Sequence, residues 1–124
     1  MVSDDPPFTR AVKELGLSPQ EQYLYYHHLN NLYGTGKLER PDGAVSTVSQ
    51  AVVSGPGSLY YSIPTIWEGR ELPIDQARLR ASQQGWGNFP AYATPEQADM
   101  RYQTIHPYIE QDTVDYMRTR RPLR

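Results

Sequence analysis

The sequence predicts an α+β fold: an N-terminal helix, a small antiparallel β-meander of two long strands plus a stub, and then two helices. Three observations predict it. Apolar side chains in residues 19–33 recur at spacings of three and four, as on one face of a helix. Residues 45–67 change to an alternating, β-branched pattern that is typical of strands. Helix-start signals return after residue 73. A chain of 124 residues is long enough for one domain rather than two.

The first helix is predicted over residues 19–33 because its start signal is complete. Ser18 is a good N-cap, Pro19 fits the first helical position, and Glu21 completes a capping box. Gly34 is a typical helix stop. We expect the apolar face of this helix to consist of Tyr25, Tyr26, Leu29, Leu32 and Tyr33.

The meander is predicted from two runs rich in strand-forming residues. Residues 45–53 and 58–67 form the long strands around a turn at 54–57, and a tight turn at Glu68-Gly69 returns a stub over 70–72. Pro64 predicts an edge or a local kink in the second strand, because proline cannot donate to a ladder. One face of that strand is expected to carry Leu59, Tyr61, Ile63, Thr65 and Trp67.

Two helices are predicted in the last third of the chain. The first begins at Pro73, ends at Gly85 and buries Ile74, Ala77 and Ala81. The aromatics of the loop 85–90 are expected to fold back onto the sheet. The last helix starts at a second capping box, Thr94 to Gln97, and Pro107 is expected to kink it, so that residues 107–118 project as an arm.

These elements divide the chain into three parts. Residues 1–17, which contain Pro6, Pro7 and Gly16, are predicted to be a flexible N-terminal arm. Residues 18–116 form the single α+β module, and residues 117–124 form a basic C-terminal tail. Hydrophobic residues make up only 38% of the chain, so we expect a thin core that a partner surface completes.

Composition and motifs exclude several classes of chemistry. The chain has no cysteine, which excludes disulfide scaffolds, thiol nucleophiles and cysteine-based zinc sites. No apolar run approaches the roughly 18 residues of a membrane span. His27 and His28 are adjacent and so face different directions on a helix, and Gly34-Thr35-Gly36-Lys37 lacks the strand and helix of a phosphate loop. We therefore expect no catalytic, cofactor-binding or metal-ligating residues.

The aromatic and basic residues predict two contact surfaces. Ten tyrosines and two tryptophans favour a protein interface, for which the candidate exposed residues are Tyr25, Tyr60, Trp67 and Trp86. Residues 118–124 hold no acid, although residues 1–117 carry 8 basic and 14 acidic side chains, a balance of -6. This tail is either a solvated terminus or a site for DNA or an acidic protein groove, with Arg118, Arg120, Arg121 and Arg124 as the contacts.

Several motifs between Ser18 and Tyr116 resemble a module found in tailed-bacteriophage genomes. The first block holds His28-Leu29-Asn30-Asn31-Leu32, Pro41-Asp42-Gly43 and Ser46-Thr47, and the second is Ile63-Pro64-Thr65-Ile66-Trp67-Glu68-Gly69-Arg70. The third runs from Asn88-Phe89-Pro90-Ala91-Tyr92 through Thr94-Pro95-Glu96-Gln97-Ala98 and Tyr102 to His106-Pro107-Tyr108-Ile109-Glu110-Gln111-Asp112. The module occurs in small virion-associated proteins and within large internal or polyvalent phage proteins. The resemblance implies a structural or ejected virion component without enzyme activity.

The sequence therefore predicts a structural virion protein that binds other virion proteins, such as a portal, nozzle, fibre or internal protein. Its expected place is the tail or portal-proximal assembly of the virion, where it is oligomeric, and the host cytoplasm during assembly. One alternative is an internal or ejected protein that contacts DNA through the arginine tail. Another is an accessory cell-wall hydrolase, whose only support is the acidic cluster of Glu68, Glu71 and Asp75. Turn and capping chemistry accounts for all three of these acids.

Overall fold

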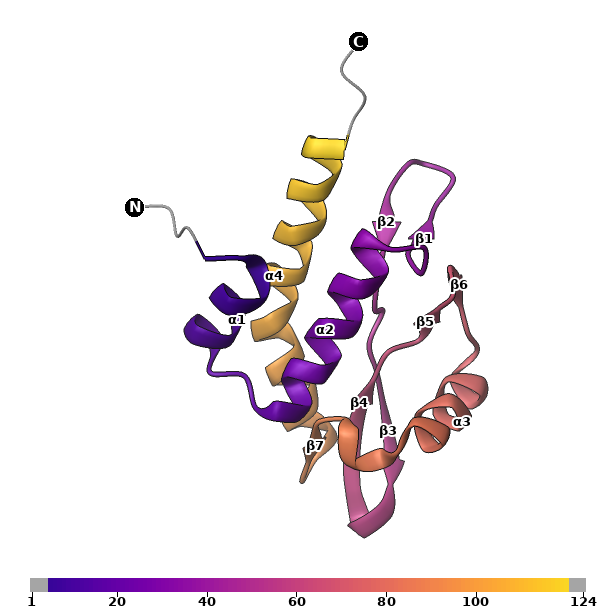
Figure 1. The fold of residues 1–124 in the computed structure, drawn as a ribbon. Coiled ribbons are helices and arrows are strands. Elements are labelled where there is room, and N and C mark those ends of the chain that lie inside the picture. Colours follow the sequence, from indigo (N-terminus) through magenta and orange to yellow (C-terminus); the bar gives the residue numbers. More distant parts are fainter. Residues whose placement is uncertain (1–4, 121–124) are drawn as a thin grey trace.

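The computed structural model describes residues 5–120 and confirms the α+β class (Figure 1). The helices are α1 (Pro7–Leu15), α2 (Pro19–Tyr33), α3 (Ile74–Gln84) and α4 (Pro95–Arg120). The strands are β1 (Leu38–Glu39), β2 (Val45–Ser46), β3 (Ala51–Gly55), β4 (Leu59–Ile63), β5 (Ile66–Trp67), β6 (Arg70–Glu71) and β7 (Ala91–Tyr92).

The capping box predicted at α2 forms completely, and the one predicted at α4 forms in part. The backbone N–H of Glu21 donates to Ser18 Oγ at 3.1 Å, and Glu21 Oε1 accepts from the Ser18 N–H at 2.9 Å, which closes the capping box of α2. At α4, the Gln97 N–H donates to Thr94 Oγ1 at 3.1 Å, and the Gln97 side chain accepts from Ala93 instead of Thr94. These contacts span three or four residues, so short-range sequence is enough to specify them.

The segment predicted as a flexible arm is a packed helix from residue 7 onward. Helix α1 begins at Pro7 and ends at Gly16, whose φ of 62° is the left-handed geometry that glycine adopts easily. Ala11 and Leu17 are buried against α2 and α4. Phe8, Val12 and Leu15 pack beside them at helical spacings, so the sequence already held a short apolar stripe.

The predicted meander exists, but its strands are shorter than expected. β3 pairs antiparallel with β4, with Val53 opposite Tyr61, and β4 pairs on its other edge with β7, a strand that the sequence pattern did not predict. β1 pairs with β2 in a separate ribbon, and no strand was predicted at β1. β5 and β6 form a second ribbon around Glu68 (φ 54°) and Gly69 (φ 78°), which is the tight turn predicted at this point.

Both predicted long strands are interrupted, the first where tertiary hydrogen bonds hold residues 47–50 and the second at Pro64. Residues 47–50 leave the strand path because other segments hold them: Asn31 Nδ2 donates to the Thr47 carbonyl at 2.7 Å. The Thr65 N–H donates to the Val48 carbonyl at 2.9 Å, and the Thr65 hydroxyl donates to the Ser49 carbonyl at 2.6 Å. The second strand breaks at Pro64 and Thr65, in agreement with the kink that Pro64 predicted.

Helix α4 continues through Pro107 to Arg120. Ile105 before the proline and Ile109 after it are both buried in one cluster with α1 and α2. Asp112, one turn further, is also buried. The prediction that residues 107–118 form a projecting arm is therefore wrong at least as far as Asp112, because this part of α4 packs on the body.

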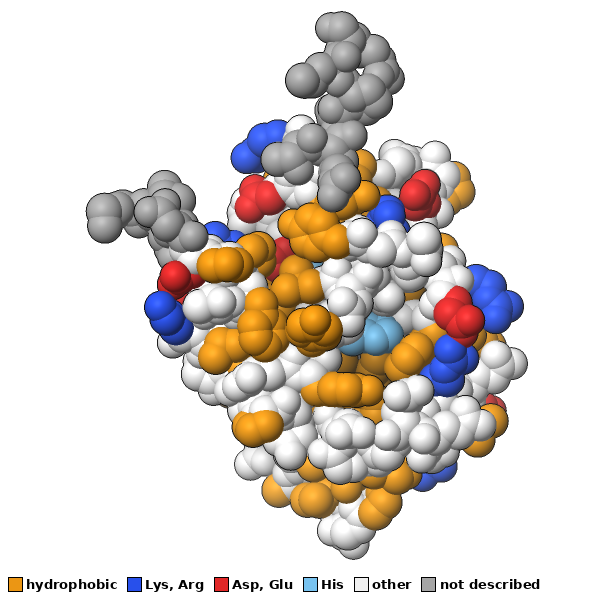
Figure 2. Space-filling view, in the orientation of Figure 1, with side chains coloured by type: hydrophobic (Ala, Val, Ile, Leu, Met, Phe, Trp, Pro, Cys, Tyr) orange, Lys and Arg blue, Asp and Glu red, His pale blue; other side chains and the backbone are white. Residues whose placement is uncertain are grey.

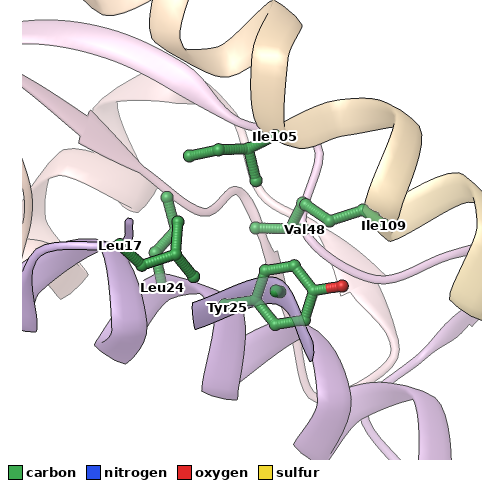
Figure 3. Close-up of a cluster of buried hydrophobic side chains, with 7 residues drawn as sticks. Leu17, Leu24, Tyr25, Val48, Ile105 and Ile109 are labelled. Carbon is green, nitrogen blue, oxygen red and sulfur yellow. The ribbon is translucent and has the colours of Figure 1, made fainter. Parts of the chain in front are cut away.

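Two apolar clusters form the core. One lies between α1, α2 and α4 and contains Ala11, Leu17, Leu24, Tyr25, Val48, Ile105 and Ile109 (Figure 3). The other joins the sheet to α3 and contains Val53, Tyr61, Ile63, Ala77, Ala81 and Phe89. The predicted α3 stripe is right for Ala77 and Ala81 and wrong for Ile74, which is 53% exposed. Trp86 does fold back onto the sheet, with its ring 4.9 Å from that of Tyr61.

Candidate protein-interaction site

The buried side of α2 is polar as well as apolar. His28 and Asp112 are both completely or almost completely buried, and His28 Nε2 lies 3.1 Å from Asp112 Oδ2. Tyr25 donates its hydroxyl hydrogen to the same carboxylate oxygen, and Arg10 from α1 lies 3.4 Å from Asp112 Oδ1. On its other side, His28 Nδ1 lies 2.5 Å from Thr47 Oγ1. This buried polar network joins α1, α2, α4 and the segment after β2.

Both ring nitrogens of His28 have a hydrogen-bond partner in this network, Asp112 at Nε2 and Thr47 at Nδ1. Burial, and then the hydrogen bond to Asp112, raise the pKa of Tyr25 far above its usual value, so the phenol stays protonated. The hydroxyl–imidazole–carboxylate order is that of nucleophilic triads. Thr47 is only 3% exposed, and the arrangement fastens four segments of the chain together.

A second polar cluster ties the start of α2 to α4 and β7. Arg101 donates to Glu21 Oε2 at 2.7 Å and to the Leu15 carbonyl at 2.7 Å. Tyr92 donates to the same Glu21 carboxylate at 2.8 Å. Burial alone would raise the pKa of Glu21, but the hydrogen bonds from Arg101, the Ser18 N–H and Tyr92 together hold it below its usual value.

Trp67, predicted as an interface residue, is half-buried and already engaged within the chain. Its ring centroid lies 4.5 Å from that of His27 on α2 and 4.8 Å from the guanidinium carbon of Arg80 on α3. Its indole N–H donates to the Pro64 carbonyl at 3.1 Å. His27 Nε2 lies 2.8 Å from the Ile66 carbonyl oxygen, and burial lowers the pKa of His27 below its usual value. Trp67 thus holds the β5–β6 ribbon against two helices.

The structure also places the other predicted aromatics in the fold. Tyr25 is only 1% exposed, so the prediction that it is an exposed contact is wrong. Its hydroxyl donates a hydrogen bond to the buried carboxylate of Asp112. Tyr60 is half-buried in β4, opposite Tyr92. Trp86 is half-buried between Tyr61 and Arg78, whose guanidinium carbon lies 5.5 Å from the indole centroid.

The arginine tail is only partly within the described residues. Arg118 is exposed on the last turns of α4, 3.6 Å from Asp115. Arg120 ends α4, and its side chain is outside the described part of the chain, as are Arg121 and Arg124. Among the described side chains, the structure therefore places Arg118 beside an acid, and the prediction for the other three arginines lies outside the described residues.

The exposed aromatic surface of the molecule lies on α2 instead. Tyr23, Tyr26, Asn30 and Tyr33 are all exposed, and they follow one another at spacings of three and four along its solvent side. Tyr26 is 55% exposed and Tyr33 is 51% exposed. The stripe is about 15 Å long at the helical rise of 1.5 Å per residue. We call these four residues the tyrosine face.

The tyrosine face carries no formal charge. Helix α2 contains no lysine or arginine, and its single acid, Glu21, is buried. In Figure 2, hydrophobic and uncharged side chains cover the region of α1 and α2, and most charged side chains stand toward the margins. Aromatic enrichment and charge depletion distinguish the cores of protein interfaces from other surface. The prediction that Tyr25, Tyr26 and Tyr33 share one apolar face is wrong, because Tyr25 is buried whereas Tyr26 and Tyr33 are exposed. Tertiary packing decides which tyrosines lie outside.

A groove of about 820 Å³ lies between residues 42–49 and the second half of α4. Val45, Val48, Ile109 and Met117 give it an apolar floor, and Thr47 of the buried polar network also lines it. His106 and Glu110, which lie 2.8 Å apart, stand at its edge. No sequence motif predicted this groove, because its two walls are more than fifty residues apart along the chain.

Within residues 5–120, no group of three or more histidine, aspartate or glutamate side chains could hold a metal ion. Over the same residues, no helix is both long enough and apolar enough to cross a membrane. No protein-family model, curated protein or solved structure matches this chain. The interpretation of the tyrosine face therefore depends on its own chemistry and on the sequence motifs.

Proposed function

We propose that the chain is a structural protein of a tailed-bacteriophage particle that binds virion proteins through the tyrosine face. The observation that carries the binding role is this exposed, uncharged row of tyrosines on α2. The particle context is supported by the resemblance of residues 18–116 to the phage module. We assign the chain to the tail or portal-proximal assembly, and to the host cytoplasm before it is incorporated.

Tyrosine suits this role because it combines a large apolar ring with a polar hydroxyl, so it tolerates water before binding and burial afterwards. The rings are also held in place before any partner arrives. Tyr26 packs edge-on against Phe8 of α1 at 5.8 Å between centroids, and Tyr33 packs against Tyr116 of α4 at 5.4 Å. Tyr23 packs against Phe89 at 5.4 Å. Held side chains lose less conformational entropy on association, which favours binding.

Lys37 lies beside the face: its Nζ is 5.5 Å from the ring centroid of Tyr116, which packs on Tyr33, and it donates to the Gly34 carbonyl. Other charges are paired within the chain. Lys13 and Asp5 lie 3.1 Å apart at α1, and Arg80 pairs with Glu68 beside Trp67. A neutral centre with charges outside it resembles the core and rim of a protein interface. A DNA-binding surface would instead present unpaired basic side chains to the phosphates.

The test is quantitative mass spectrometry of purified particles of the phage that encodes the chain, with copies counted against the portal protein. We expect the chain at a fixed whole-number ratio. We also expect Tyr26→Glu to reduce incorporation at least about tenfold, the equivalent of 1.4 kcal/mol. Leu79→Glu is the matched control, because Leu79 is 58% exposed but lies on α3, away from the face. Absence of the unmodified chain from the particles contradicts the proposal.

A further inference from the structure

We propose that Thr47, His28 and Asp112 form an acyl-transfer site at the wall of the groove beside α4, and that its substrates are esters with an apolar acyl chain. This inference goes beyond the proposed function and does not involve the tyrosine face. It departs from the expectation that the chain has no catalytic residues. Three features support it: the order of the side chains, the backbone that follows Thr47, and the groove.

The three side chains stand in the order of a nucleophilic triad. Thr47 Oγ1 lies 2.5 Å from His28 Nδ1, and His28 Nε2 lies 3.1 Å from Asp112 Oδ2. In the proposed site the hydrogen on Nε2 is donated to Asp112, since an ionised carboxylate only accepts, and Nδ1 is left to accept the hydroxyl proton of Thr47. Such triads are defined by geometry and roles, whatever the order of the residues along the chain.

The imidazole is held rigidly for this role. The side chains of His28 and Asp112 have no exposed area. Tyr25 donates to the carboxylate of Asp112, and Arg10 lies 3.4 Å from its other oxygen. Asp112 is therefore a positioning residue that fixes the imidazole before the substrate arrives, and fixed groups lose little free energy to reorganisation during the reaction.

The backbone after Thr47 offers donors for the negative charge that develops on the substrate carbonyl oxygen. Within residues 5–120, the N–H groups of Val48 and Ser49 donate to no protein acceptor. In α/β-hydrolases the N–H of the residue after the nucleophile contributes to the oxyanion hole, and Val48 occupies that position here. Ser49 has a φ of 41°, a left-handed conformation that is uncommon outside glycine. Backbone strain of this kind clusters at active sites.

The groove provides space for the substrate. Its volume of about 820 Å³ is typical of small-molecule sites. Its apolar floor consists of Val45, Val48, Ile109 and Met117, and Thr47 borders it. An acyl chain that lies on this floor can bring its ester carbonyl to Thr47. The low exposure of Thr47, 3%, keeps bulk water away from the reacting hydroxyl.

The proposed reaction has two halves. Thr47 Oγ1 forms a bond to the ester carbonyl carbon, its proton passes to His28 Nδ1, and the carbonyl electron pair moves to the oxygen. The carbonyl then re-forms as the bond to the alcohol oxygen breaks, and the alcohol leaves with the proton from Nδ1. A water molecule next attacks the acyl group on Thr47 and gives one proton to Nδ1. The carboxylic acid is released, and Thr47 recovers its proton from Nδ1.

The first measurement locates the acyl group. We would incubate the full chain with p-nitrophenyl octanoate, quench the reaction in acid at early times and analyse the peptides by mass spectrometry. We expect octanoyl on Thr47, together with an initial burst of p-nitrophenol. Exposed histidines also react with such esters, and the side chain of His106 is 40% exposed. Octanoyl on His106 alone, or no octanoyl on Thr47, overturns the proposal.

The second measurement compares variants. We expect Thr47→Val to lower the hydrolysis rate at least about a hundredfold and Thr47→Ser to retain it, because serine keeps the hydroxyl. Thr104→Val is the matched control, since the hydroxyl of this exposed threonine donates only to the Met100 carbonyl of its own helix, at 3.1 Å. A Thr47→Val variant that hydrolyses the ester at the unmodified rate overturns the proposal. If circular dichroism shows that Thr47→Val is unfolded, the position of the octanoyl group decides.

Two further comparisons test the positioning residue and the groove. Asp112→Asn should lower kcat at least about tenfold and leave KM unchanged, because the amide can no longer hold the imidazole in the required protonation state. An unchanged kcat overturns the role of Asp112. We also expect kcat/KM to be at least about tenfold higher for p-nitrophenyl octanoate than for p-nitrophenyl acetate, since the longer chain buries more apolar surface. Equal values overturn the assignment of the groove.

Discussion

Asp112 shows how a single residue can fasten several segments of a small fold. Its carboxylate accepts from Tyr25 and lies within bonding distance of His28 and Arg10, which stand on two other helices. Burial of such groups costs free energy that their mutual bonds roughly offset, so the network adds specificity of packing more than net stability. Removal of one member is nevertheless costly, because the others remain buried without a partner.

We predict that Asp112→Ala lowers the free energy of unfolding by about 3–5 kcal/mol, because it leaves the donors of Tyr25 and His28 without their acceptor. Urea denaturation monitored by circular dichroism measures the change. Asp115→Ala is the control on the same helix: Asp115 takes part in surface contacts with Gln111 and Arg118, worth about 0–1 kcal/mol. Equal losses in the two variants would show that the buried network does not form.

The pKa of Glu21 predicts an acid dependence of stability. Its pKa is lowered in the folded chain, so the unfolded chain binds the proton more readily. The stabilisation is therefore complete above the ordinary carboxyl value of 4.5 and is lost as pH falls through the folded value. We expect Glu21→Gln to reduce the difference in unfolding free energy between neutral pH and pH about 3. An unchanged difference in parallel urea titrations would contradict this role of Glu21.

At the scale of the element, tertiary contacts override local signals in both terminal helices. Helix α1 begins next to two prolines, Pro6 and Pro7, and is followed by Gly16, yet Ala11 is fully buried against α2 and α4. Pro107 would break an isolated helix, because it lacks an N–H and clashes with the preceding turn. In α4 the burial of Ile105, Ile109 and Asp112 on both sides of it keeps the chain helical.

We predict that Pro107→Ala stabilises the protein by about 1–3 kcal/mol, since alanine restores a backbone hydrogen bond within α4. Pro107 is exposed, so the substitution removes little packing. Thermal denaturation gives the measurement, with a higher Tm as the expected result. A lower Tm would mean that the proline fits a bend in α4 that the fold requires.

At the scale of the whole molecule, the core consists of two apolar clusters that different elements build. One cluster lies between α1, α2 and α4, and the other lies between the sheet and α3. Arg101 of α4 and Tyr92 of β7 both bind Glu21 at the start of α2, so polar contacts connect the two regions. We therefore expect one cooperative unit instead of two independently stable halves.

This expectation is tested by one substitution in each cluster. Ile105→Ala and Ile63→Ala should each lower the free energy of unfolding by about 2–5 kcal/mol, because each leaves a cavity at a site that is 5% exposed or less. Near- and far-ultraviolet circular dichroism transitions should coincide in both variants. Separate transitions in either variant would show that the clusters unfold independently.

Much of the fold was predictable because the information is local. Ser18 and Glu21 specify the start of α2, Thr94 and Gln97 specify that of α4, and Glu68-Gly69 specifies the β5–β6 turn. The candidate site was less predictable. Tyr25 and Tyr26 are neighbours of the same type, and the structure buries the first while it exposes the second.

The sequence by itself determined the α+β class, the helix starts and the uncharged, tyrosine-rich character of α2, because caps, turns and composition act over a few residues. Only the tertiary structure decided that Tyr25 turns inward toward Asp112, that Trp67 and Trp86 pack within the chain, and that Tyr23, Tyr26 and Tyr33 remain outside. The physical reason is that the partners of these side chains lie as far as 87 residues away along the chain. The carboxylate of Asp112 on α4 is hydrogen-bonded to Tyr25 and His28 on one side of α2, and the opposite side of α2 is exposed.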